Sequence, residues 1–194
     1  MVGMIGTRMR SYTLACAGVA FVACLFLWHP LHVGAATRTV TNCTDSGVSG
    51  DGSLRGEIAA AGSGDTISFT AGLNCTSGGA GPIVVGSTLT LAQNVTIDGT
   101  GATIAVDGGY TGGNTGVQVF AVNSAVTASL NTLTIQHGKA GDGGGILNNG
   151  GTLTVTNSTL SGNSATNGGG IYNNGTLTVT NSTFSGNSAT NDGG

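Results

Sequence analysis

The chain has 194 residues, of which 37 are glycine, five are Lys or Arg and eight are Asp or Glu, so its formal net charge is −3. So few basic residues exclude a nucleic-acid binder that works by neutralising phosphates. The low charge, together with many Thr, Val and Ile residues, also excludes a highly charged disordered tail.

The first 35 residues have the pattern of a secretory signal peptide. Arg8 and Arg10 give a positively charged start, residues 12–28 form an apolar run, and residues 33–35 offer small side chains for cleavage. We therefore expect residues 1–35 to be removed on export. The alternative is a retained membrane anchor, since the apolar run is nearly long enough to span a bilayer.

Two cysteines follow the leader, and they stand in matching contexts. Cys43 lies in TNCT and Cys75 lies in LNCT. Because an exported protein with an even number of cysteines can form disulfides, we predict a bridge that staples the N-terminal region. Two free thiols are the alternative. A metal site needs more ligands than two lone cysteines, and we predict neither a metal nor any other cofactor.

Residues 51–65, DGSLRGEIAAAGSGD, form the one segment that we expect to be helical. Asp51 or Ser53 can cap this helix, and its apolar residues share one face. A short amphipathic helix can cover the open end of a β structure, so we assign residues 36–65 to an N-terminal cap. Strand-like runs follow within residues 66–142: TISF, PIVV, STLTL, VTI, ATIAV, VQVFAV and LTI.

A repeat of 24 residues governs the second half of the chain. Residues 143–167 and 168–191 differ by one extra Gly and two apolar exchanges, and a third copy begins as the sequence stops. We assign residues 143–194 to regular repeats, and we expect further repeats and a C-terminal cap beyond Gly194. A fixed period of this length is typical of solenoids, whereas propeller blades need about 40 residues.

The interior of the repeat indicates strands. TLTVT alternates with the period of two that strands have, so Leu153 and Val155 share one face and the threonines point the other way. No segment of the repeat has the apolar stripe of a helix, which disfavours leucine-rich repeats. An outer-membrane β-barrel would need girdles of aromatic residues that the chain lacks.

These features predict a parallel β-helix in which identical residues stack from coil to coil, with residues 66–142 as irregular coils of the same solenoid. Asn side chains at turns can form ladders along such an axis. In-register stacking would also place like charges on each other, which explains why residues 143–191 carry none. Four residues are the predicted members of these ladders: Asn157 with Asn181, and Asn163 with Asn187.

Two features resemble families of bacterial surface proteins. Residues 50–69, GDGSLRGEIAAAGSGDTISF, resemble the CSLREA-type N-terminal motif, although Gly52 stands where that motif has Cys and Gly56 is an insertion. The repeats resemble those of polymorphic outer membrane proteins, which pair GG-[AG]-[ILV] with FxxN. These are GGGI at 143–146 and 168–171, FSGN at 184–187 and LSGN at 160–163. The resemblance implies a right-handed parallel β-helix at the cell surface and an adhesin-like role.

Several parallel β-helix proteins are polysaccharide lyases or hydrolases, so candidate catalytic residues are considered next. Glycoside hydrolysis needs two nearby carboxylates, and a lyase needs carboxylates for a cation together with a base. The candidates are Asp98, Asp107, His137, Lys139 and Asp142. The competing interpretation is structural, because the first two precede glycine in turns and the others lie in a glycine-rich loop. A catalytic cluster beyond Gly194 is a further possibility.

The sequence thus favours an exported surface-display or adhesin-like module, located at the outer membrane or outside the cell. The expected partner is an unidentified surface ligand such as a polysaccharide or a neighbouring cell; we expect no nucleic acid, and membrane contact only through the leader or a missing C-terminal anchor. A carbohydrate-active enzyme is the first alternative. The second is an ice-binding face formed by the Thr-x-Thr-x-Thr segments at 152–156 and 176–180.

Overall fold

The computed structural model describes residues 34–193, and these residues are almost entirely β structure. All but the last two residues of the predicted leader lie outside the described range. The described elements are β1 (Thr37–Val40), α1 (Leu54–Ala60), β2 (Asp65–Phe69), β3 (Asn74–Cys75), β4 (Ile83–Val84), β5 (Leu89–Leu91), β6 (Val95–Asp98), β7 (Thr103–Asp107), β8 (Phe120–Val122), β9 (Thr127–Asn131), β10 (Thr134–Gln136), β11 (Lys139–Asp142), β12 (Ile146–Asn148), β13 (Thr152–Thr156), β14 (Thr159–Ser161), β15 (Ser164–Asn167), β16 (Ile171–Asn173), β17 (Thr176–Thr180), β18 (Thr183–Ser185) and β19 (Ser188–Asp192).

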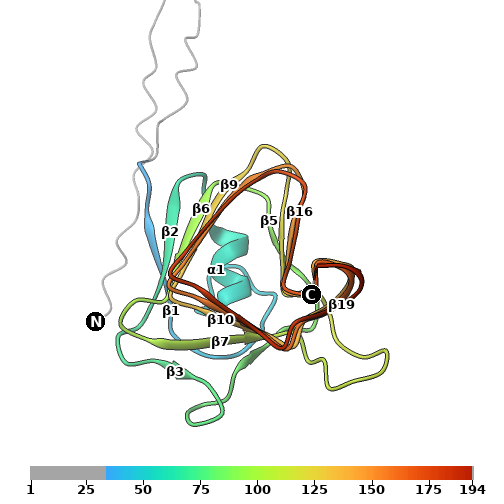
Figure 1. Ribbon diagram of the computed structural model, residues 1–194. Coiled ribbons are helices and arrows are strands. Elements are labelled where there is room, and N and C mark those ends of the chain that lie inside the picture. The colour runs from blue at the N-terminus through green and yellow to red at the C-terminus, as the bar shows by residue number, and fades with distance from the viewer. Residues whose placement is uncertain (1–33, 194) are drawn as a thin grey trace, which may run out of the picture. The chain divides into compact units, whose positions relative to one another are not determined.

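The strands form four parallel sheets that run along one solenoid of about six turns. The sheet orders are β1-β2-β6-β9-β13-β17, β18-β14-β10-β7-β3 with β4 also on β7, β16-β12-β8-β5, and β11-β15-β19. Figure 1 looks along the solenoid, so that successive coils overlie one another as a rounded triangle with a side loop. The predicted parallel β-helix is confirmed.

The core is a narrow stack of apolar side chains from successive coils. In β13, Leu153 and Val155 are fully buried, while the threonines between them lie outward. These two residues stand in register with Ala128 and Leu130 of β9. The alternation of TLTVT therefore places its apolar residues in the core and its threonines outside, as the period of two predicts. The same arrangement repeats one strand spacing along the axis.

The repeat length changes within a single coil, and the extra glycine explains why. Ile146 pairs with Ile171, which is 25 residues later, whereas Thr152 pairs with Thr176, which is 24 residues later. The additional residue is absorbed in the turn between β12 and β13, where Gly150 has a φ of 84°. Both flanking strands keep their register, because a positive φ is readily adopted by glycine.

The N-terminal cap differs from its predicted bounds in two ways. The helix is α1, seven residues long, rather than the whole of 51–65, and Ser53 is its N-cap, with Oγ accepting a hydrogen bond from Gly56 N. It ends because Ala61 is extended, before the glycine at position 62 is reached. In addition, β1 pairs with β2 and so belongs to the first coil of the solenoid, not to a separate cap.

The helix nevertheless covers the N-terminal end of the core. Leu54 is fully buried in the same apolar cluster as the strands, and α1 lies within the outline of the coils when they are viewed along the axis (Figure 1). At the opposite end, Val179 and Phe184 of the last described coil are 40% and 44% exposed. Their counterparts one coil earlier, Val155 and Leu160, are fully buried.

Candidate functional site

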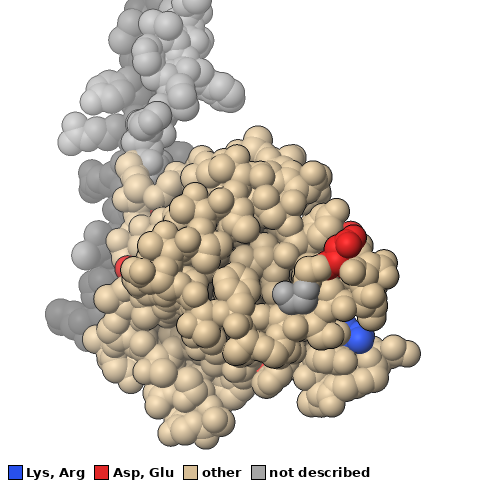
Figure 2. Space-filling view, viewed as in Figure 1, with Lys and Arg blue, Asp and Glu red and all other residues tan. Residues whose placement is uncertain are grey.

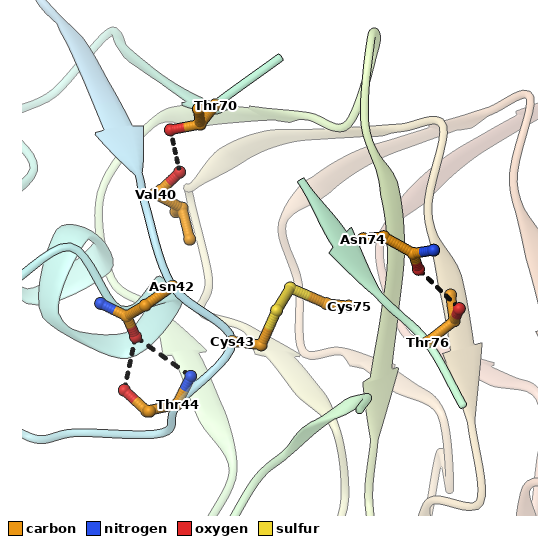
Figure 3. Close-up of a disulfide and its surroundings, with 8 residues drawn as sticks. All are labelled: Val40, Asn42, Cys43, Thr44, Thr70, Asn74, Cys75 and Thr76. Carbon is orange, nitrogen blue, oxygen red and sulfur yellow. Dashed lines mark hydrogen bonds between the residues drawn. A yellow bond between two sulfur atoms is a disulfide. The ribbon is translucent and has the colours of Figure 1, made fainter. Parts of the chain in front are cut away.

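The two cysteines form a disulfide between the segment after β1 and strand β3 (Figure 3). Their Cα atoms are 5.5 Å apart, and Cys75 is fully buried. Each cysteine follows an asparagine whose side chain accepts a hydrogen bond from the threonine two residues on: Thr44 bonds to Asn42 and Thr76 bonds to Asn74. The matching NCT contexts are thus two similar turns joined by one bridge.

Asp107 and His137 are the pair of candidate residues that the fold brings into contact. His137 Nδ1 lies 2.9 Å from Asp107 Oδ2, and the same oxygen accepts a 2.7 Å hydrogen bond from Gln136 Nε2. Asp107 Oδ1 accepts a further bond from Gly109 N at 2.7 Å. The parallel register of β7 and β10, which places Asp107 beside Gln136, causes this contact between consecutive coils.

His137 occupies a backbone position that later coils fill with glycine. Its φ is 51°, and the register of β10, β14 and β18 aligns it with Gly162 and Gly186, whose φ values are 63° and 62°. A histidine in this left-handed region is less favourable than glycine. The bond to Asp107 holds the imidazole in place, and this leaves Nε2 on a side chain that is 48% exposed.

The other candidate catalytic residues make their contacts away from the Asp107–His137 pair. Lys139 places Nζ 4.5 Å from the centre of the Tyr110 ring, a cation–π contact, and Tyr110 N donates to His137 O. Asp98, at the end of β6, accepts bonds from Thr100 and Asn131. Asp142 in β11 accepts a 2.7 Å bond from Asn167.

The arrangement limits the chemistry of these residues. Asp98 and Asp107 end strands of different sheets, and each accepts hydrogen bonds from its own turn and from the following coil. Within residues 34–193, no group of three His, Cys, Asp or Glu side chains could hold a metal ion. The partner of the Asp107 carboxylate is a histidine, not the second carboxylate that a glycosidase needs.

Asp107 makes the stability of the fold dependent on pH. Burial alone would raise its pKa, but the bonds from His137, Gln136 and Gly109 N outweigh burial and lower the pKa below its ordinary value. A lowered pKa stabilises the fold above about pH 4, and this contribution is lost as the pH falls through the folded-state value. We expect Asp107→Asn to reduce the proton uptake that accompanies acid unfolding, as measured from the pH dependence of urea unfolding. Thr166→Asn, an exposed exchange that removes no carboxylate, is the control and should leave the uptake nearly unchanged.

The buried Asn ladder lies at Asn163 and Asn187. Asn163 is fully buried; its Nδ2 donates to Asn187 Oδ1 at 2.9 Å and to Ile135 O at 3.0 Å, and its Oδ1 accepts from Gly138 N at 2.8 Å. Asn187 repeats the same bond one coil later, donating to Leu160 O at 2.9 Å. These side chains satisfy backbone groups inside the turns of successive coils.

The second predicted ladder is arranged differently. Asn157 and Asn181 both have positive φ, at 51° and 49°, and Asn157 Nδ2 donates to Asn131 of the preceding coil. Asn131 in turn donates to Asp98, so this ladder runs from Asp98 to Asn157. A further ladder joins Asn148 to Asn173 at 2.7 Å, and sequence reasoning missed it because the paired residues are 25 apart, not 24.

The outward face of the six-stranded sheet carries a continuous column of hydroxyl side chains. The column consists of Thr37, Thr66, Thr96, Ser129, Thr154 and Thr178, each paired with the next in the sheet register. None of these residues is buried. The sequence repeat shows the last two members alone; the other four become visible only through the register of the irregular coils.

Charged side chains are sparse and mostly paired among the described residues. Arg55 binds Asp45 at 2.7 Å, and Arg38 binds Asp65 at 3.1 Å. Figure 2 shows a face of the molecule that is almost free of charged side chains. Within the described part of the chain no helix is both long and apolar enough to cross a membrane.

The comparisons with known proteins identify no relative of this chain. Family models, curated proteins and solved structures were all compared with the chain, and none of them matches it.

Proposed function

We propose that the chain is an exported surface-display module, an adhesin-like scaffold that holds a long, regular face in front of a surface ligand. The observation that supports this best is the in-register parallel stacking of six strands in the sheet β1-β2-β6-β9-β13-β17, along a solenoid of about six turns. A stack of this kind presents the same side-chain types at a fixed spacing along its axis. The leader pattern of residues 1–35 and the resemblance to the repeats of polymorphic outer membrane proteins support export to the cell surface.

Two internal features suit such a scaffold to conditions outside the cell. The Cys43–Cys75 disulfide ties the first coils together, and bridges of this kind persist in oxidising compartments. No buried side-chain nitrogen or oxygen in the described residues is without a hydrogen bond. A cross-linked stack whose buried side-chain polar atoms are all hydrogen-bonded has few local openings at which a protease can cut.

The test is to express the complete chain with its leader in a bacterial host and to detect it with antibodies on intact and on lysed cells. We expect the protein on intact cells, and we expect those cells to adhere to polysaccharide or to other cells more strongly. The matched control is a leader variant, Arg8→Glu with Arg10→Glu, which should keep the protein inside. A chain that stays in the cytosol with its natural leader, or display without any gain in adhesion, would contradict the proposal.

The hydroxyl column favours ice binding as a second candidate function. Six stacked hydroxyl residues at a strand spacing of ~4.8 Å form a regular row along one sheet. We expect thermal hysteresis that Thr154→Lys abolishes, since the lysine interrupts the column. Thr166→Lys, on the exposed face of β15 in another sheet, should keep the hysteresis. If the unmodified protein shows no hysteresis, this candidate is wrong.

A further inference from the structure

Asparagine stands directly before glycine at three places in the chain, at 149–150, 167–168 and 174–175. The display function uses none of these pairs. Asparagine is a chemically labile residue in proteins. It is most labile before glycine, because glycine has no side chain to shield its backbone nitrogen and adopts many backbone angles. The three glycine nitrogens have different surroundings in the structure, so we expect the pairs to differ in reactivity.

The reaction at such a pair needs only the chain and water. The glycine nitrogen gives up its proton to solvent and attacks Cγ of the preceding asparagine. The new bond replaces the bond from Cγ to Nδ2, so ammonia leaves and a cyclic imide remains. Water then opens the imide at either carbonyl, which gives aspartate or isoaspartate, and nothing is oxidised or reduced. The reaction is therefore fastest where the glycine N–H is exposed and makes no hydrogen bond within the protein.

Two of the three glycine nitrogens are engaged in hydrogen bonds. Gly168 is buried, and its N–H donates to Asp192 O at 2.6 Å. Gly175 N donates to Asn173 Oδ1 at 3.4 Å, in the turn that precedes β17. A side chain at either glycine would also collide with a neighbouring backbone oxygen. The backbone at these two pairs therefore has little room for the rotation that ring closure needs.

The third pair differs because its turn, before β13, contains one additional glycine. Asn148 Oδ1 accepts a hydrogen bond from Gly151 N at 3.0 Å, which corresponds to the bond at Gly175 one coil later. The additional residue, Gly150, follows Asn149, and both are exposed. Among the described residues, the N–H of Gly150 donates no hydrogen bond. A Cβ atom at Gly150 would meet no heavy atom closer than 3.4 Å, so this backbone has room to rotate.

We propose that Asn149 is a modification site, at which the folded protein gains a negative charge by spontaneous deamidation through Gly150. The charge enters repeats that carry none between residues 143 and 191. The isoaspartate product continues its backbone through Cβ and so lengthens the turn. This turn already absorbs an additional residue while β12 and β13 keep their register. The inference does not depend on the display function, because water is the sole co-reactant.

The test compares the three pairs within one peptide. The folded protein is incubated in mildly alkaline buffer for increasing times, then unfolded and digested with trypsin. Residues 140–194 form a single tryptic peptide, because no Lys or Arg follows Lys139. Tandem mass spectrometry then locates each amide that has become a carboxylate. We expect deamidation at Asn149 to be at least about tenfold faster than at Asn167 or Asn174, because those two pairs need a local opening first.

The same protein unfolded in guanidinium chloride is the control, because residues 148–150 and 173–175 share the sequence Asn-Asn-Gly. The two sites should deamidate at similar rates there, so a difference in the folded protein reports the structure.

A variant that lacks Gly150 adds a second comparison. Asn149 would then precede Gly151, whose N–H is bonded, and its deamidation should slow to the rate of Asn174. If this variant does not fold, the comparison within the natural protein decides. Equal rates at Asn149 and Asn174 in the folded natural protein, or a faster reaction at Asn167, would overturn the proposal.

Discussion

Replacing Asn163 with leucine is expected to lower the free energy of unfolding by about 2–6 kcal/mol. Leucine has a similar size, so the change removes hydrogen bonds rather than volume. The buried amide satisfies Ile135 O and Gly138 N in the preceding turn and pairs with Asn187 in the next. Two buried backbone groups lose their partner, and each unsatisfied group costs about 1–3 kcal/mol.

The measurement is urea unfolding followed by circular dichroism, with Asn149→Leu as the matched control. Asn149 is exposed in the same repeat, and a surface exchange of this kind should change the stability by less than about 0.5 kcal/mol. Equal stabilities of the Asn163→Leu and Asn149→Leu variants would show that the ladder does not stabilise the stack.

Removing the disulfide is expected to have a similarly large effect. The bridge closes a loop with a sequence separation of 32 residues. Closing a loop of that length lowers the conformational entropy of the unfolded chain and so stabilises the folded state by about 3–4 kcal/mol. The double variant Cys43→Ser with Cys75→Ser should be destabilised by this amount. Because Cys75 lies in β3 and Cys43 follows β1, we expect the loss of stability mainly in the first coils.

Reduction provides the internal control for the second prediction. A reducing agent should lower the unfolding midpoint of the natural protein to that of the double variant, and it should not change the variant itself. A variant as stable as the natural protein would mean that packing of α1 and β1 alone holds the first coils together.

The sequence was most informative where the chain repeats. Identical copies of TLTVT must stack in register for their apolar residues to share a core, and β13 and β17 do so. The ladder at Asn163 follows from the same argument, because a polar residue at a fixed place in each repeat needs a partner in the next. The left-handed turn at Asn157 redirects its side chain to the preceding coil, and periodicity alone does not reveal that.

The irregular coils were less predictable for a physical reason. Asp107 meets His137 across 30 residues, and that contact depends on loop lengths between β7 and β10 for which the sequence has no period.

The central claim is that consecutive coils run parallel and in register, and solution NMR tests it most directly. Cross-strand contacts between backbone protons of Thr152–Thr156 and Thr176–Thr180 should join residues at a constant offset of 24 along the whole strand, as the pairing of β13 with β17 requires. An offset that changes by two with each successive residue would mean antiparallel strands. That result, or contacts between residues three apart within the repeat, would contradict the stacked β-helix described here.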